Sequence, residues 1–343
     1  MKLIRLMAAG AVGLTTLSGC TMFNDNLSPC PEPITELSFR YDYNMDYKDY
    51  FKDHVHCLDL YIFDEEGNFV DSYSELDNTR IKNGGFTVGF PLPPGKYVAY
   101  AYGGTACKDA SFVKLFESGL SLRPEHLKVD MKGSYYYVEN ENTDAPGTVF
   151  TELTNEEHES LALHNLFYGK TEFEVMEERV PVDPIYMRRN TNDIKVNVGY
   201  EDKRSMDKKD FHLTIEDDNN TFDYQNNLTK SGKILYRPWV KDDTTIDHLL
   251  QSEFTISRLV EGNNPVIMVK STDDKENILE IPVIGKIGDK KAEVAPEMPL
   301  QEYLDRENSW LVEITLPDDA SWADAKIEIK EWDVNDNPVY DFE

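Results

Sequence analysis

The chain has 343 residues, of which 40% are hydrophobic and 11% aromatic, so it is long and apolar enough to fold into about two domains. Its 64 acidic and 35 basic residues give a formal net charge of −29 at pH 7. A surface this acidic repels polyanions, which argues against nucleic acid and anionic membrane surfaces as partners.

Residues 1–19 have the composition of an export signal. Lys2 and Arg5 supply positive charge, and the apolar stretch LMAAGAVGLTTL that follows is too short to span a bilayer. The segment ends in Leu17-Ser18-Gly19-Cys20, which resembles the lipobox of bacterial lipoproteins. That resemblance implies cleavage before Cys20 and lipidation of Cys20, so lipid would anchor the mature chain. The alternatives are an ordinary signal peptide with a chance cysteine, or a buried N-terminal helix.

Residues 20–33 are polar and contain prolines, which is typical of a flexible tether. Three cysteines follow Cys20, and Cys57 lies in an apolar strand pattern, where we expect a small core residue. Because an exported chain meets oxidising surroundings, we expect a disulfide between Cys30 and Cys107. A metal site built from the three cysteines is the alternative, but no C-x-x-C spacing supports it.

Alternating apolar residues predict a strand-rich first half. Residues 35–43 alternate as a half-buried strand requires, and CLDLYIFD at 57–64 is followed by a turn and a second hairpin strand. Further strands are predicted at 84–90 and 91–104, where a proline–glycine turn precedes an aromatic run. We also expect a short helix over 111–118 and strands within 126–138 and 161–175.

Prolines between two apolar stretches predict a domain boundary near residue 178, which separates domains at 34–177 and 178–343. An amphipathic helix is predicted over 297–307, with Leu300, Tyr303 and Leu304 on one face. Many short strands at this spacing are typical of an all-β chain with two tandem β-sandwiches. Beyond the boundary, the predicted strands are at 211–217, 233–238, 253–259, 265–271, 278–284, 310–316 and 325–334.

The sequence contains no phosphate-binding loop, dinucleotide-binding glycine motif, serine-hydrolase motif or H-E-x-x-H zinc motif. The glycines at Gly84-Gly85, Gly103-Gly104 and Gly285/Gly288 are better interpreted as turns. We therefore expect no cofactor, no small-molecule substrate and no enzymatic activity.

Two stretches contain possible metal ligands. His54 and His56 would point to the same face of a strand, although exposed polar residues at a strand start are the preferred interpretation. The stretch EDDNNTFDYQNN at 216–227 is rich in oxygen ligands but lacks the glycine and final glutamate of an EF-hand loop. A solvated turn is the better interpretation there, and we expect no metal.

Several short motifs, taken in order, resemble the FimB-type fimbrial anchor lipoproteins, a family of fimbrillin-associated anchor subunits. The matching pieces are Cys30-Pro31, the strand from Phe39 to Asn44 and the hairpin from Val55 to Gly67. They continue with LPPGKYVAYAYGG and with LQEYLDRENSWLVEITL, which precedes the strand ending in Trp332. The last strand in that family usually reads I-N-G-W, whereas this chain has Ile329-Lys330-Glu331-Trp332.

The resemblance implies two transthyretin-like β-sandwich domains in a structural lipoprotein at the cell outer membrane, held there by lipid on Cys20. It further implies that the protein binds fimbrial polymer subunits, anchors the fimbrium and limits its length. Such subunits join by strand exchange, in which main-chain hydrogen bonds give affinity. We expect the C-terminal segment 331–343 to supply a strand, seated through Val334, Val339, Tyr340 and Phe342. Alternatively, this segment folds back as the last strand of its own domain, or frays.

Two other functions are consistent with a lipid-anchored β-rich chain. The first alternative is a glycan-binding surface lipoprotein of a nutrient-uptake system, which requires an exposed aromatic platform. Such a platform would have to come from residues such as Trp239, Trp310, Trp322 and Trp332. A hydrolase with two carboxylates about 5–9 Å apart in a cleft is the third function.

Overall fold

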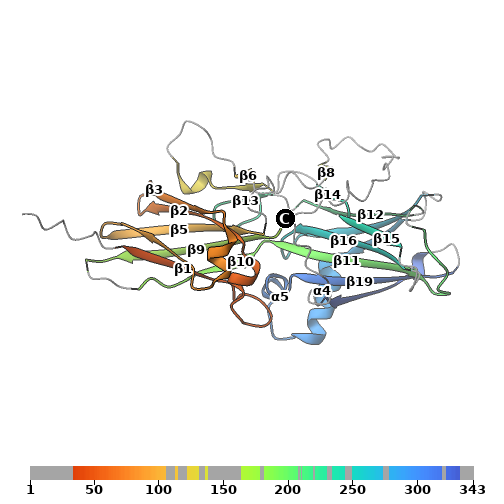
Figure 1. Cartoon of the computed structure of the whole chain (residues 1–343). Coiled ribbons are helices and arrows are strands. Elements are labelled where there is room, and N and C mark those ends of the chain that lie inside the picture. Colours follow the sequence, from red (N-terminus) through yellow and green to blue (C-terminus); the bar gives the residue numbers. More distant parts are fainter. Residues whose placement is uncertain are drawn as a thin grey trace, which may run out of the picture. The chain divides into compact units, whose positions relative to one another are not determined.

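Alternating apolar residues build most of the molecule into β-sheets, as Figure 1 shows for the computed structural model of the chain. Within the described residues strands predominate and helices are few and short, so the predicted all-β class is confirmed. No helix in this part of the chain is long and apolar enough to cross a bilayer. The structure describes residues 34–105, 113–114, 122–130, 136–137, 164–177, 181–207, 209, 211–218, 221–229, 234–243, 249–272, 278–318 and 322–332.

The first sheet has seven strands in the order β3-β2-β5-β9-β10-β1-β4. Neighbouring strands are antiparallel except β1 and β10, which run parallel with Phe39 beside Ile185. Buried residues of β1 and β4 share one apolar cluster with residues of β2, β5 and β9, so the sheet curls around its own core. The strands are β1 (Thr35–Arg40), β2 (Cys57–Asp64), β3 (Phe69–Glu75), β4 (Thr87–Phe90), β5 (Gly95–Gly104), β9 (Leu166–Val175) and β10 (Ile185–Arg189).

Two five-stranded sheets and one three-stranded sheet complete the described β-structure. The sheet β15-β16-β11-β19-β20 contains the second parallel pair, in which β11 runs beside β19. Its strands are β11 (Thr191–Tyr200), β15 (Val240–Asp243), β16 (Leu250–Ser257), β19 (Ser309–Leu316) and β20 (Lys326–Glu331). The sheet β18-β17-β12-β14-β8 consists of β8 (Tyr136–Tyr137), β12 (Phe211–Asp217), β14 (Ile234–Tyr236), β17 (Val266–Ser271) and β18 (Ile278–Pro282). The small sheet consists of β6 (Val113–Lys114), β7 (Val129–Asp130) and β13 (Thr221–Phe222).

In the second half, one of two helices agrees with its prediction and the other was not predicted. Helix α5 (Leu300–Arg306) confirms the helix predicted at 297–307, and it buries Tyr303 and Leu304. Helix α4 (Val283–Val294) was not predicted. The strand expected at 278–284 ends at Pro282, and α4 begins at the next residue. Val283, Ile284 and Ile287 then bury one helical face. The other helices of the described residues are α1 (Phe51–His54), α2 (Asn78–Lys82) and the 3-10 turns η1 (Pro124–His126) and η2 (Trp322–Asp324).

The glycine interpretations are partly wrong. Gly84 and Gly85 have positive φ angles of 75° and 66°, which confirms a turn there. Gly103 and Gly104 are instead the last two residues of strand β5. Gly103 packs closely there, because a Cβ on it would lie 2.9 Å from Cγ1 of Val55. Gly285 and Gly288 lie inside helix α4.

The predicted helix over 111–118 is also wrong where the structure describes it. Val113 and Lys114 form strand β6 and pair with Asp130 and Val129 of β7. Pairing with a distant strand overrides local helix propensity in such short segments. The division into two domains at residue 178 stays a prediction, and β9 and β10 on either side of that position belong to one sheet.

Two glycine substitutions test this packing. We expect Gly103→Ala to lower the free energy of unfolding by about 1–3 kcal/mol, because its methyl group overpacks against Val55. Gly288→Ala is the matched control: its Cβ meets nothing within 4 Å inside α4, so it should stabilise by about 0.5–1 kcal/mol. Urea denaturation of both variants measures the difference, and equal effects would contradict the assigned packing of Gly103.

Candidate functional site

A single residue connects the seven-stranded sheet to the next sheet. Strand β10 ends at Arg189 and β11 begins at Thr191, with Asn190 fully buried between them. The Asn190 N–H donates to the Leu166 carbonyl at 2.6 Å, and its carbonyl accepts from the Arg258 N–H at 2.9 Å. This short connection, bonded on both sides, restricts bending at the crossing.

The side chain of Asn190 makes a second, reciprocal contact. Its amide nitrogen donates to the side-chain oxygen of Asn226 at 2.6 Å, and the amide nitrogen of Asn226 donates back at 3.0 Å. Asn226 has a positive φ of 63°, a conformation that asparagine tolerates better than most residues. The pair satisfies both buried amides and ties the crossing to the turn after β13.

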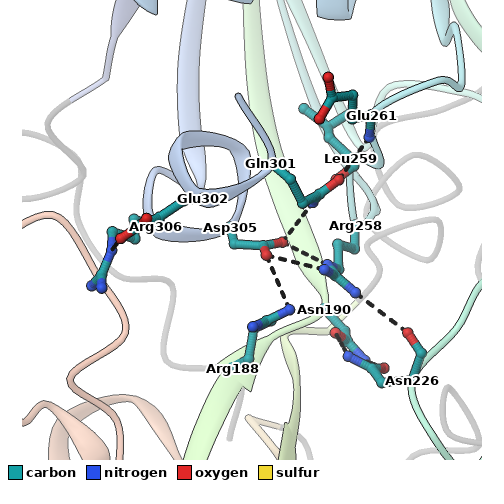
Figure 2. A network of polar contacts seen from close by, with 10 residues as sticks. All are labelled: Arg188, Asn190, Asn226, Arg258, Leu259, Glu261, Gln301, Glu302, Asp305 and Arg306. Carbon is teal, nitrogen blue, oxygen red and sulfur yellow. Dashed lines mark hydrogen bonds and ion pairs between the residues drawn. The ribbon is translucent and has the colours of Figure 1, made fainter. Parts of the chain in front are cut away.

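The buried carboxylate of Asp305 holds the centre of this junction, which Figure 2 shows. Arg258 donates to both carboxylate oxygens, with its Nε at 2.6 Å and its Nη2 at 3.0 Å. A second guanidinium, from Arg188 of β10, lies 3.0 Å from Oδ2. Gln301 donates to Oδ1 at 2.9 Å, so one carboxylate receives four contacts. The Asp305 side chain is only 2% exposed, which makes these contacts necessary for its burial.

The same arginine and glutamine extend the network. Arg258 Nη1 donates to the Asn226 carbonyl at 3.4 Å, and Gln301 Nε2 donates to the Leu259 carbonyl at 3.2 Å. The Gln301 side-chain oxygen accepts from the Glu261 N–H at 2.7 Å. The network therefore connects α5, β10, the end of β16 and the turn after β13 through groups that each have a partner.

The next residue, Arg306, makes a second connection from α5 to the first sheet. Its Nε lies 2.8 Å from Glu302, and its Nη1 donates to the Asn44 carbonyl at 3.3 Å. Its guanidinium carbon lies 4.1 Å from the ring centroid of Tyr43 and 4.3 Å from that of Tyr47. The loop after β1 therefore reaches α5 through aromatic and main-chain contacts.

That loop is shaped by its own asparagine. The Asn44 side-chain nitrogen donates to the Tyr41 carbonyl at 3.1 Å and to the Lys48 carbonyl at 2.8 Å. Arg188 stacks on the same Tyr43 ring at 4.6 Å, so this ring contacts two guanidinium groups. We call the set Tyr43, Asn44, Arg188, Asn190, Asn226, Arg258, Gln301, Asp305 and Arg306 the Asp305 junction.

A titratable carboxyl lies just beyond α5. Burial raises the pKa of Glu307 from its ordinary 4.5 to about 7, and the charge of Glu331 adds to this. The Glu307 carboxylate accepts from the N–H groups of Ser309 and Asn308, both at 3.0 Å, and these bonds oppose the rise together with Arg189. The two hydrogen bonds at the start of β19 therefore depend on the protonation state of the Glu307 carboxyl group.

A sequence model described as fimbrillin-A associated anchor proteins Mfa1 and Mfa2 matches residues 27–338. The chain belongs to this family. The motif residues that suggested it, Tyr43-Asn44 and Asp305-Arg306, come together at the Asp305 junction. This fimbrial anchor family supports a fimbrial accessory role for the protein.

Solved structures share the fold. A chain from Bacteroides thetaiotaomicron, assigned as an adhesin, is 28% identical with a TM-score of 0.74, covering 89% of this chain and 98% of that one. A second protein from that organism, assigned as polysaccharide-binding, is 18% identical with a TM-score of 0.70, and the coverage is 89% and 99%. The fimbrial anchor protein Mfa2 of Porphyromonas gingivalis is 14% identical with a TM-score of 0.61, covering 87% and 97%. No curated protein matches the sequence.

The site residues predicted for this anchor-family chain lie outside the described residues. They are Cys20, Cys30, Cys107, Val334, Val339, Tyr340 and Phe342. Cys57 is buried in β2, as expected for a core residue, and its thiol donates to the Gly104 carbonyl at 3.5 Å.

The two histidines do not form the strand pair that a shared ion would need. His54 is the last residue of α1, where its ring packs edge-on against Tyr41 and Tyr50. His56 precedes β2, and its Nδ1 lies 3.2 Å from the Thr105 carbonyl. Within the described residues no group of three metal-ligating side chains occurs.

The oxygen-rich stretch at 216–227 begins in β12 and continues in β13, and its described turn lies at 223–227, after Phe222. The Asp223 carboxylate accepts from the N–H groups of Gln225 and Asn227, both at 2.8 Å. The tryptophans likewise do not make an exposed platform: Trp310 and Trp322 are 0% and 8% exposed and belong to the core. Trp239 and Trp332 are half-buried.

Sequence reasoning missed Arg188 and Arg258 as partners of the family motif. Both lie in strand-forming stretches, and their only local signal is a charged residue within an otherwise apolar pattern. Such a residue needs a buried counter-charge, but the sequence does not indicate which of the 64 acidic residues supplies it.

Removing the central charge tests the junction. Asp305→Asn leaves Arg258 buried without its carboxylate, and we expect the free energy of unfolding to fall by about 3–5 kcal/mol. Glu302→Gln on the same helix is the control, because Glu302 pairs with Arg306 near the surface and should cost less than about 1 kcal/mol. Chemical denaturation measures both, and equal small losses would show that Asp305 does not hold the junction.

Glu307 predicts a pH dependence. Because its pKa is higher in the folded chain than in the unfolded chain, the folded state binds this proton more tightly. This contribution is fully present below pH 4.5 and is lost as the pH rises to about 7. The unfolding free energy of Glu307→Gln, measured from pH 4 to pH 8, should therefore fall less steeply than that of the wild type. Parallel curves would contradict the assignment.

Proposed function

We propose that the protein is a non-enzymatic anchor or accessory subunit of a fimbrium, tethered to the outer membrane by lipid on Cys20. In this role it holds fimbrial polymer subunits at the cell surface and limits the length of the polymer. The observation that carries the proposal is the match of the anchor family over residues 27–338. The 28% identical chain assigned as an adhesin supports the same class of function.

The Asp305 junction supports a structural role. An anchor must transmit force between its membrane tether and the polymer, so its two ends need a stiff connection. The one-residue crossing at Asn190 and the contact of Arg188 in β10 with Asp305 in α5 provide such a connection, and Arg258 fixes the Asp305 carboxylate in place. Aromatic contacts of Arg306 with Tyr43 and Tyr47 add a second link to the strand that follows the tether.

The C-terminal strand β20 favours attachment of the polymer near the end of the chain. Within the described residues β20 pairs only with β19, so one edge of β20 has no strand beside it. Ile327 and Ile329 point toward the core cluster and are only partly buried. Glu331 and Trp332 are bonded to β19, so we propose that the part of the segment 331–343 after Trp332 donates a strand to the first polymer subunit through Val334, Val339, Tyr340 and Phe342.

The decisive experiment has two readouts in cells. Radioactive palmitate should label the wild type and leave Cys20→Ala unlabelled, which tests the anchor. A pull-down with a tagged chain should recover fimbrial subunits, and truncation after Trp332 should abolish their recovery. Unchanged recovery after truncation would rule out the C-terminal segment, and recovery of polysaccharide-uptake components alone would contradict the fimbrial role.

A further inference from the structure

An anchor under tension is pulled at two points, and in this chain the two points lie next to strands that meet the force in different directions. The tether enters the described fold at Ile34, directly before β1. The polymer side leaves it at Trp332, directly after β20. This inference rests on the proposed function, because anchoring is what places tension between these two points.

Strand β1 is loaded along its length. It runs from Ile34 toward the Asp305 junction, with its first four residues paired to β4 and its last two to β10. Tension at Ile34 pulls β1 lengthwise past both neighbours, so the ladder hydrogen bonds bear the force together. The loop that follows β1 is also bonded to Arg306 of α5.

Strand β20 is loaded from one end. It is antiparallel to β19, with Lys326 beside Thr315 and Glu331 beside Trp310. Its C-terminal end lies at the junction, where the Trp332 N–H donates to the Ser309 carbonyl at 2.9 Å, three residues after α5. Tension that draws Trp332 away from Ile34 therefore lifts this end of β20 away from β19, and the bonds break one after another.

Besides the ladder with β19, the end of β20 is held by the Tyr303 hydroxyl, which donates to Glu331 at 2.9 Å, and by Lys195, whose Nζ lies 5.2 Å from the Trp332 ring centroid. Four of its residues, Lys326, Glu328, Lys330 and Glu331, are exposed, and the ion pairs of Lys326 with Glu201 and of Lys330 with Glu313 lie at the surface. Its two apolar residues, Ile327 and Ile329, are only partly buried. We propose that β20 is a tension-release strap: it peels from β19 before β1 slides, and so lengthens the protein while the Asp305 junction stays closed.

Single-molecule stretching in two geometries tests the strap. In both, one tether is attached at Ile34 through an azide-bearing amino acid. In the first geometry, the other tether is attached at Asp333 of a Lys326→Ser variant. We expect β20 to peel from β19 as the first event, at a lower force than any later event. The first extension should correspond to Pro317–Glu331, roughly 50 Å of extended chain at about 3.3–3.6 Å per residue.

The second geometry places the other tether at Lys326, so both variants lack the surface pair to Glu201. Here the force draws β20 lengthwise along β19, and the early low-force extension should be absent. The same first event in both geometries, or no early extension with the tether at Asp333, would overturn the proposal. Purified protein suffices, so this result is separate from recovery of fimbrial subunits in the pull-down.

Discussion

The carboxylate of Asp305 is the contact on which the arrangement of the junction depends. Removing a carboxylate from water costs several kcal/mol even after the protein relaxes, so its burial requires strong partners. Arg258 supplies two parallel N–H donors, and Arg188 brings the end of β10 to one of the same oxygens, Oδ2. Helix α5 has only seven residues and would be unstable alone, so it depends on these contacts and on the burial of Tyr303 and Leu304.

The fold was predictable wherever local periodicity and packing agree. The alternation in residues 35–43 and 310–316 predicts β1 and β19, because one face of each strand meets a core. Helix α4 was missed because ILEIPVI is a short apolar run, and such runs fit a strand or a buried helix equally well. There Pro282 ends the strand, and the apolar residues after it continue at helical spacing.

The junction was only half predictable. Sequence motifs drew attention to Tyr43-Asn44 and to Asp305-Arg306, which the structure brings into contact. The partners of Asp305 were not predictable, because Arg188 in β10 and Arg258 directly after β16 are far away in the sequence. Periodicity indicates which face of a strand is buried. It does not indicate which two buried charges, on different elements, form a pair.

Directional polar contacts suit a joint under tension better than an apolar interface would. The hydrophobic effect is non-directional, so two packed apolar surfaces can slide past each other with little change in their buried area. A carboxylate held by both arms of Arg258 has one favourable orientation, because the planar guanidinium matches the two oxygens. Rotation at Asn190 would move Arg188 of β10 relative to this fixed carboxylate, so it would break the contact of Arg188 with Asp305 and the reciprocal bonds to Asn226 together. Lysine at position 258 would keep the charge but lose this orientation, so the geometry of the Arg258 pair, rather than its charge alone, keeps the carboxylate in place for Arg188.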